Sequence, residues 1–466
     1  MTIVAVPDDV LLEIFEFFLG KDSPDHIGNY KYDGWQILVH VCRTWRYIVL
    51  ASPLRLDLKL YCTQKRSVNL GTLDIWPALP IVVAANNVVS KGGVATIIAA
   101  LRQHNRVCKI FYQHRQFQDS LLKEFAAIDE PFPVLTSLGL SSFERNVTVL
   151  PDSFLGGSAP QLRSLYLEGI PYPSIGRLLS STTNLVRLSL WGIPHSGYIS
   201  PETIVPCLST LSRLKSLELG FQYDRSRVRR TSRHPPPLKR VVFPNLTFLR
   251  FRGNIKYLED ILSQIEAPML NTSYFCFFNQ LVFDTPLLGN FIRRMETFVT
   301  IHTARVEFFH RAVLVKLSGR EEDRGALQLK ISCEPLDWQL SAVTQVLNSF
   351  LTSLTTLESL QIAVYPNRWQ GEIEDIQWRE LFHAFAYVKK MTLEGEATIQ
   401  LVVPPLPEFA GEGATEILPA LQNLSLTTYD WQPSGLVKEA IDQFIATRQL
   451  YGRSTTVQYQ DTKSEE

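Results

Sequence analysis

The sequence lacks an excess of charge of either sign, because its 466 residues include 46 Lys and Arg against 46 Asp and Glu. Proteins that bind nucleic acid usually carry a basic excess, so we expect neither nucleic acid nor an anionic membrane surface as a partner. A long hydrophobic run is also missing. The most apolar stretch, residues 81–101, is interrupted by polar residues and glycines and falls short of the ~20 apolar residues of a membrane span.

The N-terminus lacks the basic region of a secretory signal and meets Pro7, Asp8 and Asp9 early. We therefore expect an intracellular protein, in the cytoplasm, the nucleus or both. The six cysteines stand singly with no Cys-x-x-Cys pair, which argues against structural zinc.

Motifs that carry chemistry are missing as well. The chain has no phosphate-binding glycine loop, no His-Glu-x-x-His and no Gly-x-Ser-x-Gly. His302 and His310 lie near Glu307 and raise the alternative of a metal site. Their spacing of eight residues does not place them on neighbouring helical turns, and ordinary histidines are favoured. We expect no metal, no cofactor and no enzymatic activity.

The first fifty residues predict a small helical module. Residues 7–18 begin with a proline and two acids, as helices prefer, and continue with an apolar stripe at Val10, Ile14 and Phe18. A second helical stretch, residues 35–49, ends before Ser52-Pro53. Two or three short helices cannot bury this much apolar surface among themselves, so something else must cover it.

Three motifs stand out in this region: Pro7 with its acidic pair, Leu11-Leu12-Glu13-Ile14-Phe15, and Val41-Cys42-Arg43-Thr44-Trp45-Arg46. Together they resemble the F-box, and more specifically F-box-like proteins of mushroom-forming (basidiomycete) fungi. Val6 replaces the usual leucine, and the insert at residues 20–34 is longer than the common one. The resemblance implies docking onto a Skp-type adaptor and through it onto a cullin scaffold. The adaptor-binding residues that it implies are Pro7, Leu11, Leu12, Phe15, Val41, Cys42 and Trp45.

The rest of the chain repeats itself. Residues 162–171 and 185–194 both read Leu-x-x-Leu-x-Leu-x-Gly-Ile-Pro, at an offset of 185 − 162 = 23 residues. Further copies begin at Leu135, Leu214, Leu246, Leu357, Val388 and Leu421, and weaker strands are predicted at residues 55–60, 79–83, 107–112, 270–275 and 327–331. Helical stretches between copies lie at residues 172–180, 201–212, 257–266 and 341–353.

One strand–helix unit cannot bury its own leucines, so the units must stack with their strands in one parallel sheet. The predicted fold class is α/β: an all-α F-box module at residues 1–53, then an irregular right-handed leucine-rich-repeat solenoid with a curved parallel sheet at residues 54–450. A polar, flexible tail is expected at residues 451–466. A Rossmann-like domain would need a glycine-rich phosphate loop, which is missing.

A basic insertion at residues 222–241 interrupts the repeats. Arg225 to Arg240 are rich in arginine and proline, which favours a solvated loop. Arg227, Arg229 and Arg230 are candidates for an electrostatic contact with an acidic partner, and nuclear import is a further alternative.

These patterns predict the substrate-recognition subunit of a Skp–cullin–F-box ubiquitin ligase, whose solenoid binds a target protein of unknown identity. The alternative is a leucine-rich-repeat scaffold outside any ligase, whose N-terminal helices only cap the array.

Overall fold

The computed structural model describes residues 6–19, 34–63, 79–86, 91–114, 120–143, 147–222, 240–278, 280, 282–295, 298, 301–319, 326–333, 336–365, 375–410, 417–428 and 435–461. Arg227, Arg229 and Arg230 of the basic insertion therefore lie outside the described residues. The chain divides into two compact units, Met1–Ser189 with Ser196–Tyr198, and Leu190–His195 with Ile199–Glu466.

The first unit begins with three helices, α1 (Asp8–Leu19), α2 (Gly34–Val41) and α3 (Arg43–Ala51). Two of them come from the single stretch predicted at residues 35–49. The break lies at Cys42, whose backbone is extended and whose sulfur accepts a hydrogen bond from the Trp45 amide. Cys42 thus caps α3 in the way that a short polar side chain usually does.

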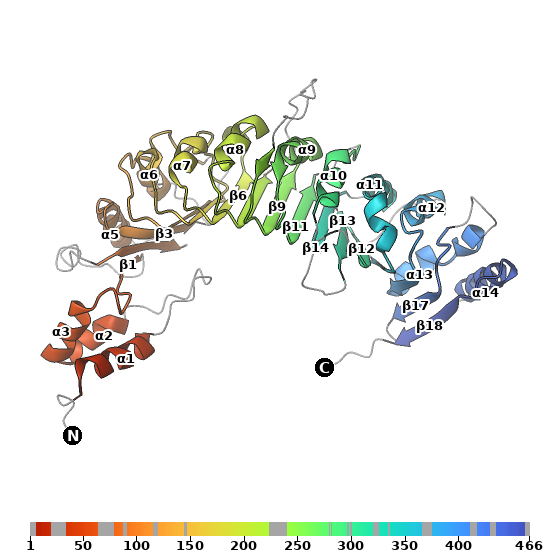
Figure 1. Ribbon diagram of the computed structural model, residues 1–466, viewed down its shortest axis with the longest axis horizontal. Helices are drawn as coiled ribbons and strands as arrows, with labels where there is room; N and C mark the ends of the chain where they lie inside the picture. Colours follow the sequence, from red (N-terminus) through yellow and green to blue (C-terminus); the bar gives the residue numbers. More distant parts are fainter. Residues whose placement is uncertain are drawn as a thin grey trace. The chain divides into compact units, whose positions relative to one another are not determined.

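The strands of the first unit pair in parallel and in chain order. They are β1 (Leu60–Thr63), β2 (Ile81–Asn86), β3 (Val107–His114), β4 (Ser137–Ser142) and β5 (Ser164–Glu168). Helices α5 (Lys91–Leu101), α6 (Ser120–Ala126) and α7 (Ile175–Ser181), with the 3-10 turn η2 (Phe154–Gly157), follow individual strands along one side of the sheet (Figure 1). The amides of Val186 and Arg187 both donate to the Arg163 carbonyl, so β6 (Arg187–Ile193) begins beside β5.

The second unit continues the strand–helix alternation (Figure 1). Its elements after the end of β6 are η3 (His195–Gly197, shared with the first unit), α8 (Pro201–Leu208), β7 (Ser216–Phe221), β8 (Val241–Val242), β9 (Phe248–Gly253), α9 (Ile255–Gln264), β10 (Ile265–Glu266), β11 (Thr272–Phe277), α10 (Pro286–Arg293), β12 (Thr303–Phe309), β13 (Ala312–Ser318), β14 (Ala326–Ser332), α11 (Leu336–Asn348), η5 (Leu351–Thr356), β15 (Ser359–Val364), α12 (Asp375–His383), β16 (Lys390–Glu394), α13 (Glu396–Val402), η6 (Leu406–Ala410), β17 (Asn423–Thr428), α14 (Gly435–Leu450) and β18 (Thr456–Asp461). Strands β8 and β10 form a separate parallel pair.

The leucines of the repeat motif form the core, as predicted. Within the copy at residues 162–167, Leu162, Leu165 and Leu167 are all buried. The corresponding leucines of the other copies are buried too, and their Leu-x-Leu segments lie in strands β4, β5, β6, β7, β9, β15, β16 and β17. The prediction of a mixed α/β fold with a large, mostly parallel sheet is therefore confirmed. The predicted handedness and curvature stay predictions.

The glycine of the motif has a structural reason. Gly169 has φ +68° and Gly192 has φ +59°, in the left-handed region where residues with a Cβ are strained. At Gly169 a Cβ would also lie 1.9 Å from the carbonyl oxygen of Ser142 on the preceding strand. The chain therefore leaves β5 at a point where a Cβ does not fit, and Gly192 supplies the same left-handed backbone within the end of β6.

The predicted parallel sheet contains one antiparallel strand, β13. The order in the second unit is β7-β9-β11-β14-β13-β12-β15-β16-β17-β18, and β13 pairs antiparallel with both of its neighbours. Strands β12 and β13 form a hairpin through the turn at His310 and Arg311. Buried residues alternate with half-buried ones along β13 from Val313, whereas β12 buries Val306, Glu307 and Phe308 in succession. The leucine motif of the repeats does not occur in these two strands.

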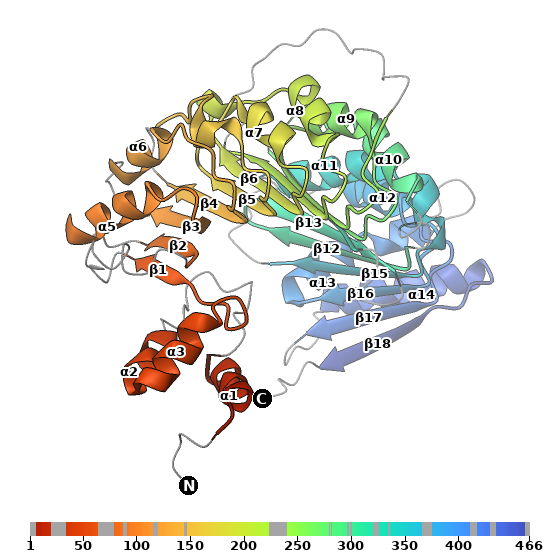
Figure 2. The ribbon, with the colours of Figure 1, turned by 60° about the vertical axis from the view of Figure 1, so that its left-hand side comes forward.

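The C-terminal segment also differs from the prediction of a flexible tail beyond residue 450. Strand β18 pairs in parallel with β17 and extends the sheet to Asp461, as Figure 2 shows. Arg448 of α14 holds this end together, because its guanidinium is buried and donates to the carbonyls of Leu418 and Leu421 and to the Thr455 hydroxyl. None of the described helices is long and apolar enough to cross a membrane.

Candidate functional site

The three N-terminal helices enclose a small apolar core. Phe15 of α1 is fully buried, and its ring meets that of Trp45 edge-on with centroids 4.8 Å apart. Trp35, Leu38, Val39, Ile48 and Val49 complete the interior from α2 and α3. The Arg46 side chain donates from Nε to the Val39 carbonyl at 2.9 Å, which ties the end of α2 to α3. These contacts make the helices one packed module.

The adaptor-binding residues predicted from the F-box resemblance divide into two groups. Leu11, Leu12 and Phe15 are 3%, 7% and 0% exposed, so they belong to the interior of the module. Trp45 and Cys42 are half-buried. Pro7 and Val41 lie on the surface, and the Pro7 carbonyl accepts the first amide hydrogen bonds of α1. The binding role of all seven residues stays a prediction. Leu11, Leu12 and Phe15 also have a structural role, because they are buried inside the module.

A second set of apolar side chains covers the outside of the same helices. We call this set the exposed apolar face, and its members are Val10 (44% exposed), Ile14 (50%), Phe17 (91%) and Phe18 (50%) on α1 with Ile37 (61%) and Val41 (52%) on α2. The four positions on α1 follow the spacing i, i+4, i+7 and i+8, and the two on α2 are i and i+4, so each set follows one helix face. Large exposed apolar groups gathered in this way usually mark an interaction surface.

Sequence reasoning identified part of this face but not its orientation. Val10, Ile14 and Phe18 were expected in the apolar stripe of the first helix. However, Leu11 and Phe15 beside them are the residues that face inward. A helix that is apolar over most of its circumference has no periodic signal that separates an inner from an outer face. Of the two most exposed members, Ile37 follows the helical period of residues 35–49, and Phe17 carries no signal beyond its hydrophobicity.

The module is joined to the first repeat by polar contacts. The Trp35 indole donates to the Lys59 carbonyl at 3.0 Å, just before β1. The Arg55 guanidinium pairs with Glu16 of α1 at 2.6 Å and lies 3.5 Å from Asp9. The hydrogen bond that Arg55 donates to the Glu16 carboxylate is the main reason that the pKa of Arg55 is raised.

The sequence raised Glu307 as a metal ligand together with His302 and His310. In the structure its carboxylate is paired with two cationic side chains. Arg305 and Lys316 each approach a different carboxylate oxygen of Glu307 at 3.0 Å, and Arg305 also reaches Glu394 at 2.9 Å. Burial raises the pKa of Glu307, but Lys316 and Arg305 outweigh burial and hold its pKa below the usual value. In the described part of the chain, no group of three His, Cys, Asp or Glu side chains could hold a metal ion.

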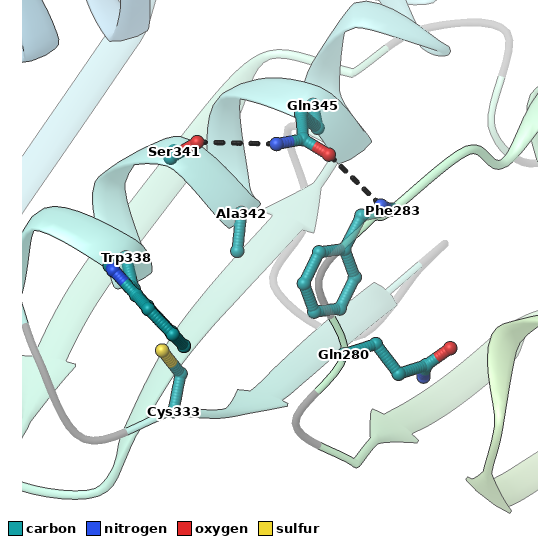
Figure 3. A pocket seen from close by; sticks show the side chains of 7 residues that line it. All are labelled: Gln280, Phe283, Cys333, Trp338, Ser341, Ala342 and Gln345. Atoms are coloured by element: carbon teal, nitrogen blue, oxygen red, sulfur yellow. Dashed lines mark hydrogen bonds between the residues drawn. The ribbon is translucent and has the colours of Figure 1, made fainter.

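A cavity of about 130 Å³ lies beside α11 in the second unit (Figure 3). It is lined by Gln280, Phe283, Cys333, Trp338, Ser341, Ala342 and Gln345. The Gln345 side chain accepts from the Phe283 amide and donates to the Ser341 hydroxyl, as Figure 3 shows. Both ends of this amide therefore serve the fold: its oxygen joins α11 to the segment before α10, and its nitrogen bonds to Ser341 one turn earlier in α11.

The comparisons with known proteins add little to this geometry. No protein-family model matches the chain, and no curated protein matches its sequence. Among solved structures, the chain is similar to the leucine-rich-repeat-containing protein LegL7 from Legionella pneumophila, with 16% sequence identity over 72% of this chain and 97% of that chain. The TM-score of 0.27 is too low to carry an argument, so the description of the fold rests on the strand pairing and the buried leucines.

Proposed function

We propose that this chain is the substrate-recognition subunit of a Skp–cullin–F-box ubiquitin ligase. In this proposal the N-terminal helices bind a Skp-type adaptor, the repeats bind a target protein, and other subunits transfer ubiquitin. The observation that carries the proposal is the exposed apolar face of α1 and α2, which includes Phe17 at 91% and Ile37 at 61% exposure. A face of this kind on a packed helical module needs a protein partner to remove it from water.

The geometry changes which residues the proposal assigns to the adaptor contact. The residues that contact the adaptor directly are those of the exposed apolar face and Pro7 at the start of α1. Leu11, Leu12 and Phe15 act indirectly, because they hold α1 against the other two helices. A substitution at these three positions would remove binding by unfolding the module, so it would not test the contact.

The test is binding of a purified Skp-type adaptor, measured by copurification and by calorimetry. Complete burial of a large apolar side chain contributes about 1.5–3 kcal/mol, so Phe17→Asp with Ile37→Asp should weaken binding at least roughly 100-fold. The matched control is Leu436→Asp on α14, because Leu436 is also largely exposed at 76% but lies in the other unit. Unchanged binding by the double variant would remove the exposed apolar face from the proposal.

The second candidate is a repeat scaffold in which the helices are only a cap. The bond from Trp35 to the Lys59 carbonyl and the Arg55–Glu16 pair favour it, because a cap must contact the first repeat. If the unaltered chain shows no binding to any Skp-type adaptor, the ligase proposal fails and the scaffold remains.

A further inference from the structure

The second unit has a sheet face that the repeat leucines do not use. In β9, Leu249 and Phe251 are buried, whereas Arg250 and Arg252 point to the opposite face and are half-buried. The same alternation holds in β11 and β14, where Tyr274 and Lys330 belong to that opposite face. Helix α9 lies against β9, and helix α11 lies against β14.

Strand register brings residues from distant repeats into rows on this face. Cys276 is aligned with Arg252 on one side and with Lys330 on the other, and Tyr274 is aligned with Arg250. Neighbouring strands lie roughly 4.8 Å apart, so the backbones of Arg252 and Lys330 are roughly 10 Å apart across β11. Two long cationic side chains at this separation can meet the same ligand segment.

Arg250 contacts two aromatic rings and a carboxylate beside this pair. Its Cζ lies 4.0 Å from the centroid of the Trp191 ring and 5.3 Å from that of Tyr274, and its Nη1 reaches Glu218 at 3.3 Å. Gly220 makes room for the indole, because a Cβ there would lie 2.5 Å from the ring. We call Trp191, Arg250 and Tyr274 the aromatic–arginine platform. Such ordered aromatic and arginine side chains are the residue types that dominate binding energy at protein interfaces.

Arg252 and Lys330 differ from the other cations of the neighbourhood. Arg250 is paired with Glu218, and Arg305 and Lys316 are paired with Glu307. Among the described residues, neither Arg252 nor Lys330 has a carboxylate partner. Arg252 lies 5.7 Å from the centroid of the Phe278 ring. Both cations also act on Cys276 between them: burial raises the pKa of that thiol, and Arg252 and Lys330 oppose the rise.

We propose that this face binds an acidic peptide segment of the target protein. The proposal rests on the proposed function, in which the repeats recognise a target, and it names the chemistry of that target. Asp or Glu side chains of the segment pair with Arg252 and Lys330 across Cys276, and an apolar side chain packs on the aromatic–arginine platform. Charge complementarity carries the argument, because β7, β9, β11 and β14 present Arg250, Arg252 and Lys330 here against Glu218 alone.

The experiment uses the full chain and a fluorescein-labelled peptide in which Asp and Glu flank one Phe, measured by fluorescence anisotropy. We expect binding that weakens as NaCl rises from about 0.05 to about 0.3 M. Arg252→Glu with Lys330→Glu should weaken it at least tenfold. The control Lys123→Glu with Lys438→Glu changes the net charge by the same amount at exposed positions on α6 and α14 and should retain binding.

Three results would overturn the proposal: no binding of the acidic peptide by the unaltered chain, equal weakening in both double variants, or preference for the peptide with Asn and Gln in place of Asp and Glu. A phosphoserine peptide that binds where the Asp–Glu peptide does not would overturn the carboxylate assignment. Adaptor binding is measured on the same variants. It should stay unchanged, so a failure here is distinguishable from a failure of the ligase proposal.

Discussion

The indole ring of Trp191 lies over Gly220, so closely that a Cβ on Gly220 would be 2.5 Å from ring carbon Cε3. The two residues come from neighbouring repeats, on β6 and β7. Because the glycine leaves space above its strand, the ring can extend to Arg250 on β9. The absence of one side chain thus determines the position of another.

Gly220→Ala should therefore displace the indole and weaken the platform. Overpacking of this kind costs about 1–3 kcal/mol, which thermal and denaturant unfolding can measure. Acidic-peptide binding should fall together with stability. Gly435→Ala is the matched control, because a Cβ there meets nothing within 4 Å. A Gly220→Ala variant as stable as the Gly435→Ala variant, with peptide binding intact, would contradict the role of this glycine.

Gly169→Ala tests the repeat motif. The substitution adds a clash with the Ser142 carbonyl to the strain of a positive φ. Positive φ in a residue with a Cβ costs about 1 kcal/mol or more, and we expect Gly169→Ala to exceed that by at least about 2 kcal/mol. Gly452→Ala separates the two effects, because Gly452 has φ +74° with nothing within 4 Å of its Cβ. Equal losses of unfolding free energy in the two variants would show that the clash relaxes.

Phe15→Ala and Phe17→Ala should affect different properties: Phe15→Ala the stability of the helical module, and Phe17→Ala the binding of the adaptor. Phe15 is fully buried against Trp45, so its loss should destabilise the helical module by about 3–5 kcal/mol, measured by hydrogen exchange of α1 to α3 amides. Phe17 is 91% exposed, so Phe17→Ala should leave exchange unchanged while adaptor binding falls. If Phe17→Ala raises exchange as much as Phe15→Ala does, the assignment of inner and outer faces is wrong.

The contribution of the Glu307 ion pairs to the free energy of unfolding should depend on pH. The folded-state pKa of Glu307 lies below the ordinary 4.5 because Lys316 and Arg305 favour the carboxylate. The stabilisation is present above the unfolded-state pKa and is lost as pH falls through the folded-state pKa. The difference in unfolding free energy between the unaltered chain and Glu307→Gln should therefore be larger at about pH 6 than at about pH 3. A difference that is independent of pH would show that the ion pairs contribute nothing.

The repeats could be predicted from the sequence by itself, because the Leu-x-x-Leu-x-Leu pattern is a local signal. Its leucines alternate with a strand's period and are too many for one unit to bury, so stacking in parallel follows from burial alone. The repeat positions confirmed as core run from Leu135 to Leu426. The helices within residues 8–51 could be predicted for the same reason, because helical periodicity is also a signal between residues close in sequence.

Only the tertiary structure decided which residues lie together and which helix face is outside. The hairpin of β12 and β13 inserts in reversed order between β14 and β15, a pairing that no periodicity encodes. Phe15 and Phe17 are both apolar helical residues, and packing against Trp45 separates them. Trp191, Arg252 and Lys330 lie far apart in sequence, and neighbouring strands bring them to one face. Pairing between distant strands depends on burial summed over whole elements, which the neighbours of a residue in the chain do not specify.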